Sequence, residues 1–235
     1  MTEKYERVDF MSTYGVVPYS IWESEDPKFS NPILKHLKER QGESTRENTL
    51  KSFGGAGENT AYTATTSYFN PKLCKIIYSS YCPKNGTIFD PFSSVVRPYM
   101  AKILDYNYVG CEVRKDECDK INEMLNTNSL FEESDVRVLN MDCREFETDQ
   151  KFDLVFTCPP YWNLETYSKQ DNDLSSITDY SDFLTEMSKV YSKCLSLMHD
   201  ESYCCFVVAD FRDYSEGRKL INHLVPFVSA SKTFS

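Results

Sequence analysis

Several features that would place this chain outside the ordinary soluble class are missing from its sequence. No apolar run approaches the roughly 18 residues that a membrane helix needs, and the longest is 204–209. The first ten residues, MTEKYERVDF, carry charges from the start, so we expect no signal peptide. These absences predict a cytoplasmic protein with no membrane partner.

Patterns typical of metal and dinucleotide sites are missing as well. The nine cysteines contain no Cys-x-x-Cys pair, and the three histidines are scattered along the chain. We therefore expect no metal site, and in an intracellular chain we expect no disulfides. No Gly-x-Gly-x-x-Gly follows the first predicted strand, which disfavours a nicotinamide dinucleotide.

The composition is that of a globular chain with an acidic surface. Of the 235 residues, 40% are hydrophobic and 26% are charged, and the formal net charge is −10. This charge argues against a surface coated for nucleic acid. It still allows an enzyme that holds nucleic acid in a local basic groove.

Two regions are expected along the chain. Residues 1–65 read as an N-terminal extension with one short helix, capped by Asn31 and opened by Pro32. Residues 66–235 read as one domain of alternating strands and helices. Strands are predicted at 87–91, 108–113, 136–140, 152–158 and 203–209, with helices between them and a last helix from Gly217. This alternation predicts an α/β fold with a mostly parallel sheet and helices on both faces.

The residues at the ends of the predicted strands are the candidate ligand-binding residues. In parallel sheets, ligands bind outside the carboxyl ends of the strands. Asp90 ends the first strand, Glu112 ends the second, and Asp142 follows the third. At the second strand a carboxylate is well placed to accept both hydroxyls of a ribose. Asp142 is placed to accept a hydrogen bond from an adenine amino group.

The fourth strand runs into a rigid aromatic turn, Thr-Cys-Pro-Pro-Tyr-Trp, at residues 157–162. Pro159 and Pro160 fix the backbone and remove two N–H donors. The preceding carbonyls are then free to face a ligand, and Tyr161 is held as a platform for a flat ring. An enzyme that acts on the exocyclic amino group of an extruded base needs these features.

In this order, the motifs resemble the amino-directed DNA methyltransferases, most closely the phage-type DNA methylases with a strand-ending Cys-Pro-Pro-Tyr. The similarity runs from about residue 66 to 213 and includes TSYFNPKL, DPF, CPPYWNLETYS and FVVADFRD. The resemblance implies a Rossmann-like, S-adenosylmethionine-dependent methyltransferase fold. It also implies methyl transfer to N6 of adenine or N4 of cytosine in duplex DNA with a flipped base, by a protein in the cytoplasm of the host cell.

The same resemblance implies a role for each site residue. The methionine end of S-adenosylmethionine would lie near Tyr68, Asn70, Asp90 and Phe92. The ribose would bind Glu112, and the adenine would lie near Asp142 and Cys143. The target base would lie at the residues implied to be catalytic: Cys158, Pro159, Pro160 and Tyr161. The carbonyl of Pro159 would accept one amino hydrogen, and Tyr161 or Trp162 would stack on the base.

Departures from the family's pattern leave alternatives open. Where the family has glycines after the first strand, this chain has Ser-Ser-Val-Val at 93–96, and valine does not adopt a positive φ cheaply. The chain ends soon after Asp213, which predicts a truncated copy of that family. One alternative is therefore a degenerate, catalytically weak binding protein of the same fold. Another is an amino methyltransferase that acts on RNA or protein.

Cys158 raises a further alternative, attack of its sulfur on cytosine C6. That reaction needs a thiolate stabilised by a nearby cation. No Lys or Arg lies between residues 152 and 168. We therefore expect Cys158 to be a neutral thiol that shapes the base pocket.

Overall fold

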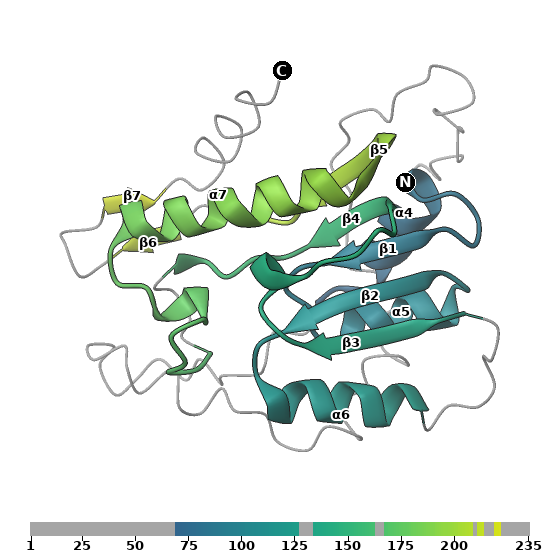
Figure 1. Ribbon diagram of the computed structural model, residues 1–235, viewed down its shortest axis with the longest axis horizontal. Coiled ribbons are helices and arrows are strands. Elements are labelled where there is room, and N and C mark those ends of the chain that lie inside the picture. Colours follow the sequence, from purple (N-terminus) through teal and green to yellow (C-terminus); the bar gives the residue numbers. More distant parts are fainter. Residues whose placement is uncertain (1–68, 127–133, 163–166, 209–210, 214–218, 222–235) are drawn as a thin grey trace, which may run out of the picture.

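The computed structural model describes residues 69–126, 134–162, 167–208, 211–213 and 219–221. Five strands form one parallel sheet in the order β3-β2-β1-β4-β5 (Figure 1). The predicted α/β fold is confirmed by this sheet and by the helices that connect its strands. The N-terminal extension, with its expected helix and its boundary at residue 65, lies outside the described residues.

The elements follow the predicted alternation closely. The strands of the sheet are β1 (Thr87–Asp90), β2 (Asn107–Glu112), β3 (Val136–Asn140), β4 (Phe152–Thr157) and β5 (Met198–Phe206). The α-helices are α4 (Pro71–Tyr81), α5 (Val96–Ile103), α6 (Lys115–Asn126) and α7 (Tyr180–Leu197). Short 3-10 helices in the described part of the chain include η1 (Cys143–Glu145) and η3 (Leu174–Ser176).

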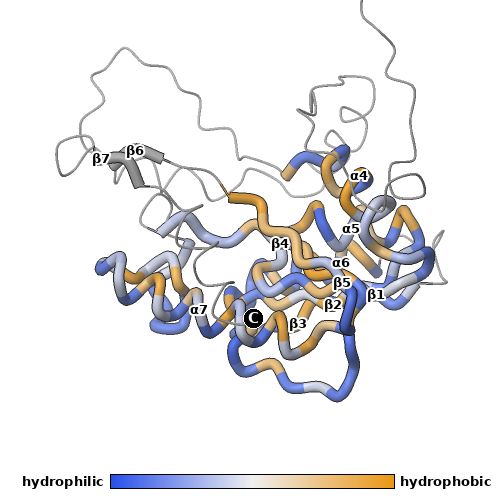
Figure 2. Tube along the Cα trace, turned by 90° about the horizontal axis from the view of Figure 1, so that it is seen from above, coloured by the Kyte–Doolittle hydropathy of each residue, from blue (hydrophilic) through white to orange (hydrophobic). Residues whose placement is uncertain are grey.

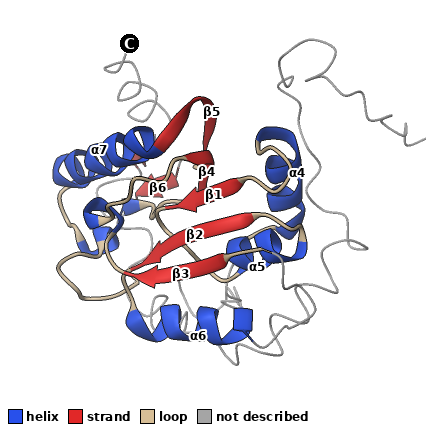
Figure 3. Cartoon of the chain, turned by 45° about the vertical axis from the view of Figure 1, so that its right-hand side comes forward, coloured by secondary structure: helices blue, strands red, loops and turns tan. Residues whose placement is uncertain are grey.

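Helices cover both faces of the sheet, as expected (Figure 3). Successive strand residues point to opposite faces, so Ile88 packs with the core under α4, α5 and α6, whereas Phe89 packs with the core under α7. Because β1, β2 and β4 are buried on both faces, each is rich in apolar residues over a short continuous run. Figure 2 shows these apolar residues gathered at the centre of the molecule.

The C-terminal part departs from the prediction in two ways. β5 begins at Met198 rather than at residue 203, with an irregular register against the start of β4. The helix expected from Gly217 is wrong at its start, where β7 (Lys219–Ile221) pairs antiparallel with β6 (Phe211–Asp213). The remainder of that expected helix lies outside the described residues. A short apolar run does not distinguish strand from helix without knowledge of its partner.

The strand order fixes where a ligand site is expected. From β1 the chain builds outward through β2 to β3, then returns to place β4 on the other side of β1. The order therefore reverses between β1 and β4, and in open α/β sheets the crevice at such a switch point binds ligands. The carboxyl ends of β1 to β3 point to the same edge (Figure 3).

Candidate functional site

Asp90, the last residue of β1, is the centre of a fully buried polar network. One carboxylate oxygen accepts hydrogen bonds from the Thr157 hydroxyl at 2.5 Å and from the Phe92 backbone N–H at 3.1 Å. The other accepts from the Tyr108 hydroxyl and from Nε of Arg97, each at 2.5 Å. A carboxylate offers about four acceptor positions, so Asp90 is saturated by the chain's own donors.

Arg97 in the first turn of α5 is the cation of this network. It is buried, pairs with Asp90, donates to the carbonyl of Phe92, and lies with Cζ 5.0 Å from the centre of the Phe69 ring. Burial acts to lower the pKa of Arg97, but the adjacent Asp90 carboxylate outweighs it and raises that pKa. Sequence analysis missed this residue, because an arginine on a helix usually reads as solvated.

The glycine-poor turn after β1 is built without any left-handed residue. Among the described non-glycine residues, positive φ occurs only at Asn85, Asp105, Trp162 and Glu201. The turn instead lies close to β2, because Ser93 donates its backbone N–H to the carbonyl of Cys111 at 2.8 Å. Gly110 makes this approach possible, since a Cβ there would lie 2.6 Å from Oγ of Ser93.

Glu112, at the end of β2, has one open carboxylate oxygen. Oε1 accepts the backbone N–H of Arg114 at 2.8 Å and its Nε at 3.4 Å. Oε2 has no hydrogen-bond partner among the residues that the structure describes. Burial raises the pKa of Glu112, and the nearby guanidinium of Arg114 opposes this only in part. Glu112 therefore keeps an acceptor that a ligand can use.

Asp142, which follows β3, has both carboxylate oxygens occupied by hydrogen bonds from Arg144. Nε of Arg144 lies 3.0 Å from both carboxylate oxygens, and its backbone N–H donates to one of them at 2.9 Å. Arg144 also pairs with Glu186 of α7. Both Glu112 and Asp142 are thus followed two positions later by the arginine that binds them, a spacing visible in the sequence but not recognised there.

The Cys-Pro-Pro-Tyr turn lies beside the end of β5. The Tyr161 hydroxyl lies 3.5 Å from Sγ of Cys158 and donates to the carbonyl of Val207 at 3.4 Å. The next residue, Trp162, is buried with φ of 46°. Its indole N–H has no hydrogen-bond partner within the described ranges. Left-handed backbone at a non-glycine residue is strained, and such strain clusters at functional sites.

The charge environment of Cys158 differs from the expectation. The sequence near this residue contains no cation, but Arg97 from α5 interacts with it electrostatically. Asp90 already pairs that guanidinium at 2.5 Å. The neutral thiol at Cys158 therefore stays a prediction.

The remaining predicted residues have separate environments. Asn70 caps α4, since its side-chain oxygen accepts the backbone N–H of Lys72 at 2.9 Å. Phe92 is partly buried against the core under α7. Cys143 is buried, which raises the pKa of its thiol to about 12. Tyr68 lies outside the described residues.

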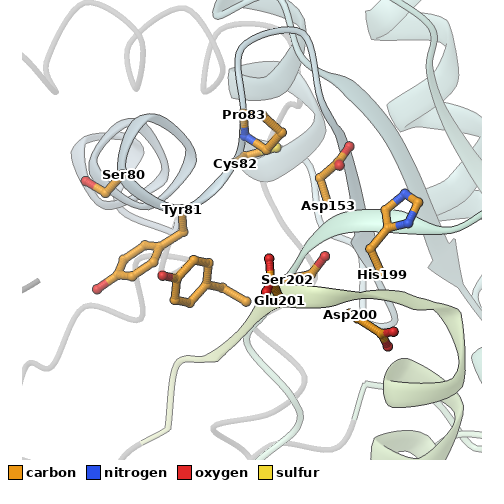
Figure 4. A pocket seen from close by; sticks show the side chains of 10 residues that line it. Ser80, Tyr81, Cys82, Pro83, Asp153, His199, Asp200, Glu201 and Ser202 are labelled. Carbon is orange, nitrogen blue, oxygen red and sulfur yellow. The ribbon is translucent and has the colours of Figure 1, made fainter. Parts of the chain in front are cut away.

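A cavity of about 390 Å³ lies at the opposite edge of the sheet (Figure 4). Its lining includes Tyr81 at the end of α4, Asp153 near the start of β4, and His199 and Tyr203 of β5. None of the residues predicted from the sequence lines it. The strand-end carboxylates therefore lie apart from this cavity.

Three His, Cys, Asp or Glu side chains nowhere come together, within the described ranges, in a group that could hold a metal ion. No helix in the part of the chain that the structure describes is both long enough and apolar enough to cross a bilayer.

No protein-family model matches the chain, and no curated protein matches it. Among solved structures, an S-adenosylmethionine-dependent methyltransferase from Clostridium acetobutylicum is 11% identical with a TM-score of 0.41, covering 61% of this chain and 49% of that one. An rRNA methylase from Streptococcus thermophilus is 8% identical with a TM-score of 0.39, covering 57% and 67%. The PH0226 protein from Pyrococcus horikoshii is 14% identical with a TM-score of 0.47, covering 69% and 78%.

This chain therefore spans about half the length of the first of these proteins, with 49% covered. At such identities and TM-scores the likeness concerns the fold alone. The fold class follows independently from the parallel sheet and its strand order.

Proposed function

We propose that this protein is an S-adenosylmethionine-dependent DNA methyltransferase that modifies N6 of adenine or N4 of cytosine. The observation that carries the proposal is the open Oε2 of Glu112, at the carboxyl end of β2 on a doubly wound sheet. A carboxylate at this position is suited to the two hydroxyls of a ribose. The sequence resemblance to amino-directed DNA methylases supports the choice of cofactor and substrate.

The residues at this edge fit the nucleoside part of that cofactor better than its amino-acid part. Glu112 would accept the ribose hydroxyls, and the adenine would lie near Asp142 and Cys143. Asp90 has no acceptor left, so its role in the proposal is to fix the turn that carries Phe92. The methionine end would then lie against that turn and the segment at Tyr68 and Asn70.

The target base would be held by the Cys-Pro-Pro-Tyr turn. Bound S-adenosylmethionine supplies a methyl group on a positively charged sulfur. The carbonyl of Pro159 would accept one hydrogen of the exocyclic amine, and Tyr161 would offer its ring to the base. The contribution of these residues is alignment of the nitrogen with the methyl group, which by itself lowers the barrier of a displacement reaction.

A second candidate is a binding protein of the same fold with little or no catalysis. Asp90 and Asp142 favour it, since both oxygens of each carboxylate already accept hydrogen bonds from the chain's own donors, whereas Glu112 keeps one oxygen open. In this candidate the cofactor or its demethylated product binds without methyl transfer.

Calorimetric titration of the full chain with S-adenosylmethionine and S-adenosylhomocysteine tests the proposal. We expect binding, followed by transfer of labelled methyl groups to duplex DNA rather than to RNA or protein. Nucleoside mass spectrometry then identifies the methylated atom. Binding without transfer supports the second candidate, and absence of binding at millimolar cofactor contradicts both.

Cys158→Ser is expected to retain whatever DNA methylation the wild type shows. The serine hydroxyl is small, and it accepts a hydrogen bond from an amino group better than a thiol does. Mass spectrometry should find an N-methylated base in both proteins. Loss of activity in Cys158→Ser, together with a covalent adduct on DNA that contains 5-fluorocytosine, would show that the sulfur is a nucleophile.

A further inference from the structure

Only one N–H group of the Arg114 guanidinium donates a hydrogen bond to another described residue of the chain. Nε is 3.4 Å from Oε1 of Glu112, and Cζ lies 5.8 Å from the centre of the Tyr167 ring. The terminal nitrogens have no hydrogen-bond partner among the described residues. The side chain, 18% exposed, is therefore held in place with most of its donors unused.

Tyr167 lies beside it, in the segment that leads to η3. At 47% it is the most exposed of the large hydrophobic side chains that the structure describes. Its backbone N–H donates to Oγ of Ser175 at 2.9 Å, and Oγ of Ser175 donates to the buried Asp173 at 2.6 Å. Arg144 binds the carbonyl of Asn172 at 3.3 Å and so ties the loop to the end of β3. The ring is therefore positioned as well as exposed.

We infer that Arg114 and Tyr167 form a contact site for a phosphate and an adjacent base of a polynucleotide. A guanidinium with unused donors matches the geometry of phosphate, and an exposed ring stacks on a base whatever its sequence. The inference rests on the proposed function and adds a contact of the nucleic-acid substrate next to Glu112. S-adenosylmethionine has no phosphate, so a phosphate bound by Arg114 comes from the substrate.

The local charge moderates the strength of this site. Glu112, Asp116 and Glu117 all interact electrostatically with Arg114. These carboxylates weaken the attraction of a phosphate, so we expect binding that is modest and sensitive to salt.

Fluorescence anisotropy with labelled duplex and single-stranded DNA tests the inference, over a range of salt concentrations. Arg114→Gln is compared with Lys115→Gln, which removes the same charge from a neighbouring side chain that is 74% exposed and pairs with Asp119. We expect Arg114→Gln to lower the affinity about tenfold and to reduce the salt slope by about 0.9 for duplex or about 0.7 for single-stranded DNA. Lys115→Gln should change both much less.

The ring is tested in the same assay. Tyr167→Ala should lower the affinity at least about fivefold through lost stacking, whereas Tyr167→Phe keeps the ring and should bind like wild type. Equal effects of the two charge variants, or of the two tyrosine variants, would overturn the inference. Adenosine monophosphate and inorganic phosphate serve as competitors, and displacement of DNA at equal concentrations would overturn the polynucleotide assignment.

Cofactor titration of the wild type without DNA separates this inference from the proposed function. If the wild type binds S-adenosylmethionine but Arg114→Gln and Lys115→Gln have the same affinity for DNA, the inference alone is contradicted. No heat with the cofactor contradicts the proposed function, and the inference with it. Cofactor heat together with selective loss of DNA affinity in Arg114→Gln and Tyr167→Ala supports both.

Discussion

Arg97→Met is expected to lower the free energy of unfolding by about 3–5 kcal/mol, because it leaves the Asp90 carboxylate buried without its counter-charge. Both side chains are inaccessible to solvent, and Nε lies 2.5 Å from the carboxylate. Urea denaturation monitored by tryptophan fluorescence measures the loss. Methionine has a similar length and no charge, so the effect reports the ion pair rather than a cavity.

Two controls make this expectation specific. Arg137→Met removes an arginine from the exposed pair with Asp135, where solvent screens the charges, so it should cost less than about 1 kcal/mol. The double variant Asp90→Asn with Arg97→Met removes both buried charges and should recover more than half of the loss. If the two single arginine variants lower the free energy of unfolding by the same amount, the buried Asp90 carboxylate does not need Arg97 as its counter-charge.

The result also bears on which carboxylate would hold the cofactor. A ligand ammonium group that contacted Asp90 would have to displace Arg97, Tyr108 or Thr157 from hydrogen bonds of 2.5 Å. A strongly stabilising ion pair makes such displacement costly. Cofactor binding, where it occurs, is then expected to depend on Glu112 rather than on Asp90.

The fold and the location of three carboxylates at strand ends could be predicted from the sequence because both depend on local patterns. Short apolar runs mark strands buried on two faces, and parallel strands bring their carboxyl ends to one edge. Asp90, Glu112 and Asp142 were placed at that edge on this reasoning, and the structure confirms that each lies at or just after the end of its strand.

The state of each carboxylate could not be predicted in the same way. Whether Asp90 is open or saturated depends on Tyr108 and Thr157, which approach it from neighbouring strands, and on Arg97 from a helix. These contacts require the register of β1 against β2 and β4. The hydrogen bond from the Tyr161 hydroxyl to the carbonyl of Val207 likewise depends on the position of β5.

Glu112→Gln is expected to stabilise the protein at neutral pH while it weakens cofactor binding. Burial raises the pKa of Glu112 above its ordinary value of 4.5, so the ionised form is less favourable in the folded chain than in the unfolded chain. Its contribution to stability is therefore greatest at acid pH and declines as the pH rises through the folded pKa. Glutamine resembles the protonated acid, so the variant should gain stability at pH 7 relative to wild type but not at pH 4 in urea denaturation.

The same substitution removes the charged acceptor proposed for the ribose. A hydrogen bond to a charged group contributes roughly 1.5–3 kcal/mol, so the affinity for S-adenosylmethionine should fall at least about tenfold. In the wild type, affinity should also decline as the pH falls through the raised pKa of Glu112, and this dependence should vanish in the variant. Asp119→Asn, which removes an exposed carboxylate paired with Lys115, should change neither property. Wild-type affinity in Glu112→Gln would show that the charged carboxylate of Glu112 does not hold the cofactor.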